Sequence, residues 1–169
     1  MKDSGSRVIP IAAATPVTGA EGETVWLYGG TPGKIEETIT EGRRGQMPPM
    51  AAAVGSEQDV HNLANYVLSL SGSPANSIGA QLGRSKFSAC AACHGADGRG
   101  NQAIGAPNLT DKVWLHGWGE DAIVSMVTNG KTNVMPAHRQ RLSAQQIHVL
   151  AAYVWHLSQP QGTPLAAAR

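Results

Sequence analysis

Cysteine and aromatic residues are scarce in this chain of 169 residues, which has two cysteines, one phenylalanine and only 5% aromatic residues in all. At most one disulfide can form, which excludes a small secreted protein held together by a disulfide framework. The 13 basic and 12 acidic residues give a net charge of +1. This balance offers no general electrostatic attraction to nucleic acid or to an anionic membrane, so neither is an expected partner.

Long hydrophobic runs are also missing. The longest apolar stretch, Val149 to Trp155, is far shorter than the roughly 20 residues that a membrane-spanning helix needs, so we predict no membrane span in this chain. The first residues include an apolar patch that Pro10 and Pro16 interrupt, which is unlike a signal peptide. We leave residues 1–24 unassigned and treat residues 160–169 as a tail.

What the chain does contain is an internal repeat. Residues 25–48 match residues 113–136 at a constant offset of 88, with nine identities in 24 positions. After a deletion of one residue, residues 56–71 match residues 143–158 with nine identities in 16 positions. We therefore interpret the two regions as copies of the same structural unit.

Each copy has the pattern of a helix, a loop with Met-Pro and a second helix. Thr31 precedes a first-turn proline, and Gly42 and Gly130 stand where the two opening helices should end. Ser143 followed by Gln146 forms a capping-box pattern for the closing helix of the second copy. Both closing helices carry one apolar stripe: Val60, Leu63, Ala64, Val67 and Leu70 in the first copy, and Ile147, Leu150, Ala151, Val154 and Leu157 in the second.

Only the second copy has a leader, an amphipathic segment over residues 74–92. We therefore predict an all-α fold in which residues 73–159 form a complete domain and residues 25–72 form an incomplete one. The missing leader would expose the apolar stripe of the first copy. We expect this half to be loosely packed or to lean on the second domain.

The leader ends in the motif Cys-Ala-Ala-Cys-His, formed by Cys90, Cys93 and His94. This pattern is the attachment site of a c-type haem: two thiols on one helical turn bind the porphyrin, and the adjacent imidazole binds the iron. Because both cysteines of the chain lie here, one covalent haem is expected. A dithiol redox pair or a zinc site completed by His116 or His138 is the alternative interpretation.

Met135 is the expected sixth ligand of the iron, because the proline after it restrains the loop that presents its sulfur. A Met/His pair raises the reduction potential of a haem. His138 is the alternative ligand. His61 and His148 recur at one repeat position, as do Trp26 and Trp114. We expect helix-surface histidines and core tryptophans, with Trp114 also a candidate for contact with the haem.

With these motifs the chain resembles subunit III, the dihaem cytochrome c subunit, of cbb₃-type cytochrome c oxidases. The stretches that carry the resemblance are "CAACHGADGRGNQAIGAPNLTDKVWLHG", "NVMPAH", "LAAYVWHLS" and "WLYGGTPGKIEETITEGRRGQMPPMAAAVG". The resemblance implies a cytochrome c fold in which Cys90 and Cys93 carry thioethers, with His94 and Met135 as axial ligands. It also implies that the carbonyl of Pro107 accepts a hydrogen bond from His94.

The chain departs from this family in lacking a membrane anchor and the first haem motif, and we expect a truncated relative. Met47 matches the axial ligand of the family's first haem, but no cysteines or histidine precede it. We therefore do not expect Met47 to bind haem.

The function implied by the resemblance is one-electron transfer at the periplasmic face of a bacterial inner membrane, with no catalytic chemistry in this subunit itself. The implied partners are the catalytic and monohaem subunits of the oxidase, and a donor cytochrome c or quinol-oxidising complex. Two alternatives remain open: a free monohaem cytochrome c that serves another reductase, and a haem-based sensor or binding module with an open sixth position.

Overall fold

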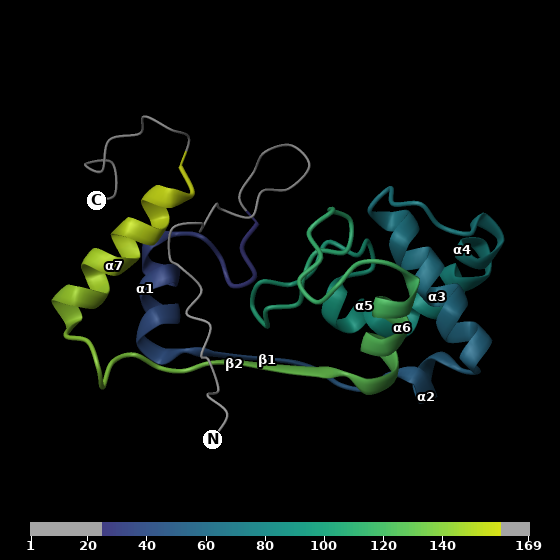
Figure 1. The fold of residues 1–169 in the computed structure, drawn as a ribbon, viewed down its shortest axis with the longest axis horizontal. Coiled ribbons are helices and arrows are strands. Elements are labelled where there is room, and N and C mark those ends of the chain that lie inside the picture. The colour runs from purple at the N-terminus through teal and green to yellow at the C-terminus, as the bar shows by residue number, and fades with distance from the viewer. Residues whose placement is uncertain (1–24, 160–169) are drawn as a thin grey trace, which may run out of the picture.

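The computed structural model describes residues 25–159 and is mostly helical, which confirms the predicted fold class (Figure 1). It also contains two short strands that the sequence did not indicate. The elements in chain order are α1 (Pro32–Glu41), β1 (Arg43–Met47), α2 (Ala51–Val54), α3 (Glu57–Leu70), α4 (Ser77–Gly83), the 3₁₀ helix η2 (Arg84–Phe87), α5 (Ser88–His94), α6 (Glu120–Asn129), β2 (Lys131–Met135) and α7 (Ala144–Leu157).

The predicted helix ends are confirmed. The Thr31 hydroxyl accepts a hydrogen bond from the backbone N–H of Lys34 at 3.3 Å and caps α1. Gly42 and Gly130 follow α1 and α6 with φ values of 69° and 67°, a backbone region that favours glycine. Ser143 caps α7 in the predicted capping box. Local sequence therefore determines where these helices begin and end.

The two Met-Pro segments, predicted as loops, pair instead as the antiparallel strands β1 and β2. Gly45 lies opposite Asn133, its own equivalent in the repeat. The pairs on either side are also related by exchange of the repeats, with Arg43 opposite Met135 and Met47 opposite Lys131. The ribbon thus has a local twofold relation centred on Gly45 and Asn133, and it joins the two ends of an elongated molecule (Figure 1).

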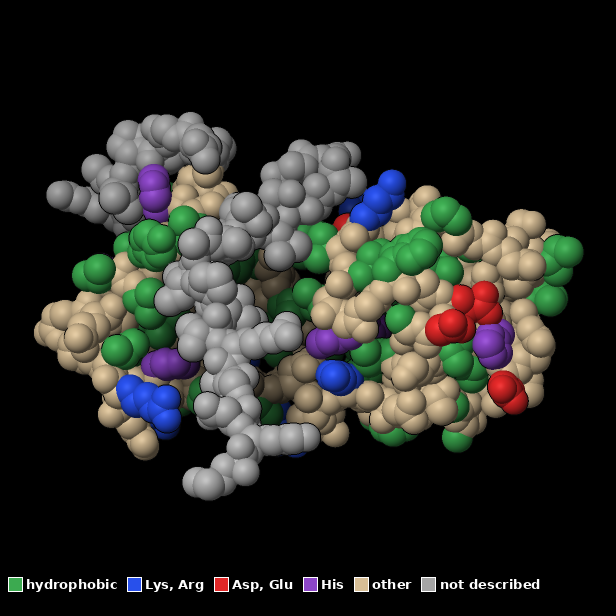
Figure 2. Space-filling model, viewed as in Figure 1, with side chains coloured by type: hydrophobic (Ala, Val, Ile, Leu, Met, Phe, Trp, Pro, Cys, Tyr) green, Lys and Arg blue, Asp and Glu red, His purple; other side chains and the backbone are tan. Residues whose placement is uncertain are grey.

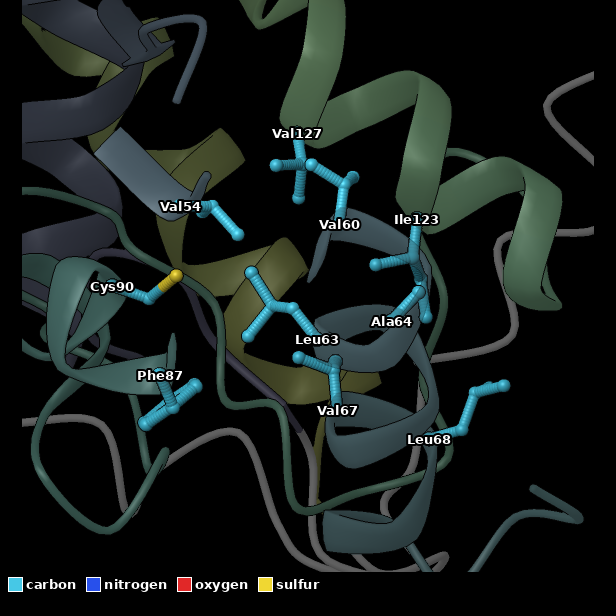
Figure 3. Close-up of a cluster of buried hydrophobic side chains, with 10 residues drawn as sticks. All are labelled: Val54, Val60, Leu63, Ala64, Val67, Leu68, Phe87, Cys90, Ile123 and Val127. Carbon is cyan, nitrogen blue, oxygen red and sulfur yellow. The ribbon is translucent and has the colours of Figure 1, made fainter. Parts of the chain in front are cut away.

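Helix α3 of the first copy packs against α4, η2 and α6 of the second copy. Residues of α2, α3, η2, α5 and α6 form a buried apolar group that we call the α3 cluster (Figure 3). Its members are Val54, Val60, Leu63, Ala64, Val67, Leu68, Phe87, Cys90, Ile123 and Val127. The apolar stripe predicted for α3 is thus buried, and it is buried against the other copy.

The remaining helices, α1 and α7, pack against each other at the opposite end of the molecule. Their buried residues, which we call the α1–α7 cluster, are Ile35, Ile39, Ile147 and Ala151. Hydrophobic side chains remain at the surface over the α7 end (Figure 2). This smaller cluster covers only part of the stripe predicted for α7.

Backbone hydrogen bonds show that the exchange of helices between the copies is reciprocal. The N–H of Met50 donates to the carbonyl of Val127 at 2.8 Å, and the N–H of His138 donates to the carbonyl of Ile39 at 3.0 Å. Met50 corresponds to His138, and Ile39 to Val127, at the repeat offset of 88. These are the same bond with the copies interchanged, as in a domain swap, here within one chain.

Ion pairs also cross between the copies. Lys86 of η2 contacts Asp59 of α3 at 2.9 Å, and His61 of α3 contacts Glu120 of α6 at 2.7 Å. Of the two expectations for the first copy, loose packing or leaning on the second domain, the structure shows the second. The division into domains at residues 72 and 73 stays a prediction from the sequence, and helix packing crosses it.

Within residues 25–159, none of the helices has the length and apolar character required to span a bilayer.

Candidate haem-binding site

Helix α5 presents the Cys-x-x-Cys-His motif at the edge of the α3 cluster. Cys90 and His94 are four residues apart, share one helix face and are buried. Cys93 lies on an exposed part of the same turn, and both thiols are free. Burial, and to a lesser extent the neighbouring Cys93, raises the pKa of Cys90. Its thiol is therefore protonated at neutral pH.

His94 is held in one orientation. Its side chain, only 8% exposed, places Nδ1 3.0 Å from the carbonyl oxygen of Pro107. Because a carbonyl can only accept, Nδ1 carries the proton and donates it, which leaves the Nε2 lone pair available as a metal ligand. The contact that the resemblance implied is thus present, and its role toward a haem stays a prediction.

Pro107 is placed by a loop that folds back on α5. The carbonyl of His94 accepts a hydrogen bond from the N–H of Gly100 at 2.7 Å, and Asn101 and Ala106 exchange backbone hydrogen bonds of 2.9 and 3.0 Å. Gly100 has φ +82°, and a Cβ there would lie 2.5 Å from the carbonyl oxygen of Ala106. Only glycine fits this close approach, so Gly100 is a positioning residue that sequence reasoning missed.

A cavity of about 520 Å³ opens beside the motif. It is lined mostly by apolar side chains, as expected for a site that takes a flat hydrophobic cofactor. The predicted site residues meet there: Cys90, Cys93, His94, Pro107, Trp114 and Met135 all line it. Met47 and Met126 line it too.

Trp114 supplies independent evidence that the cavity accepts a polar group as well. Its ring packs against the α3 cluster, while its Nε1 is buried and has no hydrogen-bond partner in the described part of the chain. A buried N–H without an acceptor is costly, so it suits a ligand that brings an acceptor oxygen. The two thiols, the free imidazole nitrogen, the apolar walls and this donor together fit a haem with carboxylate side chains.

The two repeated methionines differ in their surroundings. Met135 ends β2, is 38% exposed, and also lines a second pocket beside Trp26 and Ile35 of the first copy. Met47 ends β1, is partly buried and packs against the α3 cluster. Both methionines line the cavity, and the expectation that Met135 binds haem while Met47 does not stays a prediction.

The other histidines lie away from a common metal centre. The described residues hold no group of three or more His, Cys, Asp or Glu side chains that could bind a metal ion, which disfavours the zinc alternative. His116 Nε2 lies 3.0 Å from the Asn133 amide. His138 belongs to the α1 end through its bond to Ile39.

His61 and His148 pair with glutamates of the opposite copy, His61 with Glu120 and His148 with Glu36 at 3.3 Å. The hydrogen bond from His61 lowers the pKa of Glu120. Both histidines thus have the helix-surface role expected from their recurrence. Trp26 packs on the α1–α7 cluster and Trp114 on the α3 cluster, as predicted for a repeated core residue.

Comparison with known proteins gives a consistent picture. Residues 77–154 match the model of the family described as cytochrome c oxidase, cbb3-type, subunit III. Among curated proteins, the Cbb3-type cytochrome c oxidase subunit CcoP of Rubrivivax gelatinosus is 62% identical over 144 residues, which are 85% of this chain and 46% of that protein.

The subunit FixP of Azorhizobium caulinodans is 44% identical over 139 residues, 76% of this chain and 47% of that protein. The subunit CcoP of Cereibacter sphaeroides is 35% identical over 140 residues, with 76% and 48% covered. The chain therefore spans about half the length of these curated relatives.

Proposed function

Because this chain belongs to the subunit III family of cbb₃-type cytochrome c oxidases, we propose that it transfers single electrons through one covalently bound haem c. The observation that carries the proposal is the cavity beside α5, where both cysteines, the oriented imidazole and an unpaired indole N–H meet. The bound haem supplies a reversible one-electron change at iron, and the protein performs no bond chemistry of its own.

In this proposal Cys90 and Cys93 hold the porphyrin through thioethers, and His94 binds iron through Nε2. The Pro107 carbonyl fixes the tautomer and the ring orientation of His94 and makes the imidazole a stronger donor. The Trp114 N–H donates to a carboxylate of the bound group. A methionine from the β1–β2 ribbon is the sixth ligand, and its soft thioether favours the ferrous state and raises the potential.

We further propose that this electron passes from a donor cytochrome c or a quinol-oxidising complex to the catalytic subunits of a cbb₃-type oxidase at the periplasmic face of the inner membrane. The support is the names of the relatives, which are oxidase subunits. The near-neutral charge of the chain does not favour any one partner. Co-purification with an integral membrane oxidase would distinguish this role from that of a free monohaem cytochrome.

The test is maturation of the chain in a host that exports it and attaches haem c. We expect the intact mass to exceed the polypeptide mass by one haem, and a pyridine haemochrome spectrum to report two thioether bonds per chain. The double variant Cys90→Ala/Cys93→Ala should lose the covalent mass. Wild-type protein that matures without added mass would overturn the proposal.

A further inference from the structure

We propose that Tyr28 of the first copy is a positioning residue for the haem site of the second copy. Its ring supports the turn over residues 101–106, which leads directly into Pro107, and through this turn it keeps the Pro107 carbonyl against His94. This inference rests on the proposed haem site. It also gives a function to the opening segment of a copy that has no haem motif of its own.

The turn that precedes Pro107 is closed on itself and lies at the surface. Asn101 and Ala106 join its two ends through backbone hydrogen bonds, and the side chain of Ile104 is 50% exposed. Its inner side is bonded to α5 through the N–H of Gly100. A surface turn of this kind opens easily unless another part of the chain holds its outer side.

Residues 26–29 of the first copy hold the outer side at two points. The side-chain amide of Gln102 donates to the carbonyl of Trp26 at 3.1 Å. Gly105 lies directly against the ring of Tyr28, so closely that an added Cβ would collide with the ring. Figure 1 shows the segment, in purple, beside the loop that follows α5. Both copies therefore meet at the turn that places Pro107.

Tyr28 is itself held by α1 and β1. The guanidinium carbon of Arg43 lies 4.9 Å from the centre of the Tyr28 ring, a distance typical of a cation–π contact. Arg43 is fixed in turn, since its Nε donates to Thr38 Oγ1 at 2.9 Å and its Nη1 to Glu37 at 2.8 Å. A Cβ on Gly45, at the centre of the ribbon, would lie 3.1 Å from the Tyr28 hydroxyl. The ring thus has a rigid backing.

The repeat separates what Tyr28 shares with its equivalent from what it adds. The equivalent residue is His116, at the offset of 88. His116 contacts Asn133, the equivalent of Gly45, so both side chains lie at the centre of the ribbon. What Tyr28 adds is the contact with Gly105, in the loop that follows the cysteine motif. This contact couples the first copy to the orientation of His94.

The consequence for His94 follows from its hydrogen bond to Pro107. The carbonyl accepts from Nδ1 at 3.0 Å, which fixes the tautomer and the direction of Nε2. When the ring of Tyr28 is removed, the turn can move away from α5, and this hydrogen bond opens more often. Exchange of the Nδ1 proton with solvent then becomes faster.

The test measures hydrogen exchange at Nδ1 of His94 by NMR in the reduced, haem-loaded protein. Tyr28→Ala removes the ring, whereas Tyr28→Phe keeps the ring and removes the hydroxyl. Tyr153→Ala is the matched control, because Tyr153 is 52% exposed on α7. The backbone amides of α3 in the same samples report opening of the protein as a whole. Covalent haem content is measured in each sample.

We expect the Nδ1 proton to exchange about tenfold faster, or more, in Tyr28→Ala, because the turn opens locally. The α3 amides should change far less, and Tyr28→Phe and Tyr153→Ala should match the wild type. Equal exchange in Tyr28→Ala and the wild type would overturn the inference, as would an acceleration in Tyr28→Phe as large as in Tyr28→Ala. Acceleration of the α3 amides to the same extent would also overturn it.

A double-mutant cycle tests the contact itself. Gly105→Ala places a methyl group against the Tyr28 ring and also strains a backbone with φ +68°. Because the strain is common to both backgrounds, Gly105→Ala should lower the unfolding temperature less in Tyr28→Ala than in the wild type. Equal losses in both backgrounds would contradict the contact and the inference. Absence of covalent haem from the wild type is a separate result that would refute the proposed function instead.

Discussion

Helices α3 and α7 are copies of one sequence unit, but their equivalent side chains differ in burial. Residues 56–71 and 143–158, which include the serines at both ends of the helices, share nine of 16 aligned residues, among them the pair Leu63 and Leu150. Leu63 of α3 is 0% exposed, whereas its equivalent Leu150 in α7 is 37% exposed. The tyrosines three residues further on differ likewise: Tyr66 packs edge-on against Phe87 at 5.4 Å between ring centroids, while Tyr153 is exposed.

The difference shows that burial here is set by the partner surface and not by the helix. Within residues 25–159 one leader segment is present, and α3 packs against it. Gly83 of α4 allows the close approach, since a Cβ there would lie 2.0 Å from the carbonyl oxygen of Asn62. The polar side chain of Asn65, buried at this contact, accepts from the N–H of Asn76 at 2.8 Å and donates to the carbonyl of His61 at 3.0 Å. Burial of this amide is therefore compensated by hydrogen bonds.

The largest effect on stability should come from truncating the shared leucine to alanine in each copy. Leu63→Ala leaves a cavity in the α3 cluster and should lower the free energy of unfolding by about 2–5 kcal/mol. Leu150→Ala removes a side chain that is partly in water already and should cost less than about 1 kcal/mol. Denaturant unfolding of the two variants side by side measures the difference.

The ranking of these two variants reports directly on the helix exchange. If α7 occupied the leader instead of α3, Leu150 would be the buried leucine. A larger loss of stability for Leu150→Ala than for Leu63→Ala would therefore contradict the packing described above.

A smaller effect is expected at the glycine that lets α4 approach α3. Gly83→Ala would drive its methyl group into the backbone of α3, and such overpacking should cost about 1–3 kcal/mol. Gly33→Ala is the matched control in α1, because an added Cβ there has no neighbour within 4 Å. Alanine at Gly33 should raise helix stability by up to about 1 kcal/mol. Equal thermal shifts in the two variants would argue against close α3–α4 contact.

The smallest effect concerns the ion pair between Asp59 and Lys86, which joins the copies at the surface. The hydrogen bond from Lys86, assisted by Ser56, lowers the pKa of Asp59 from 3.8 to about 2. Since the folded pKa lies below the unfolded value, the stabilisation is complete above about pH 4 and is lost as the pH falls toward 2. Lys86→Gln should shift acid unfolding to higher pH.

In the double variant Asp59→Asn/Lys86→Gln, acid unfolding should shift no further than in Asp59→Asn alone, because the pair is already broken. Circular dichroism between pH 5 and pH 2 measures both shifts. An additive response would show that the two side chains act independently.

Much of the local structure was predictable. Helix caps at Thr31 and Ser143, the terminating glycines and the apolar stripe of α3 all follow from short-range rules. The motif at Cys90 to His94 and the hydrogen bond to Pro107 were expected from pattern and resemblance. The β1–β2 ribbon was not, because β1 has no β-branched or aromatic side chain and its partner strand β2 lies far away in the sequence.

The amino-acid sequence by itself determined the repeat, the helix boundaries and the chemistry offered by two thiols and an imidazole, because these depend on neighbours along the chain. The tertiary structure alone decided which copy of the closing helix covers the leader, and with it which end of the β1–β2 ribbon lies beside the α3 cluster. The two copies have nearly the same local preferences, so local rules cannot rank them. Packing at Gly83, Asn65 and the centre of the ribbon makes the choice.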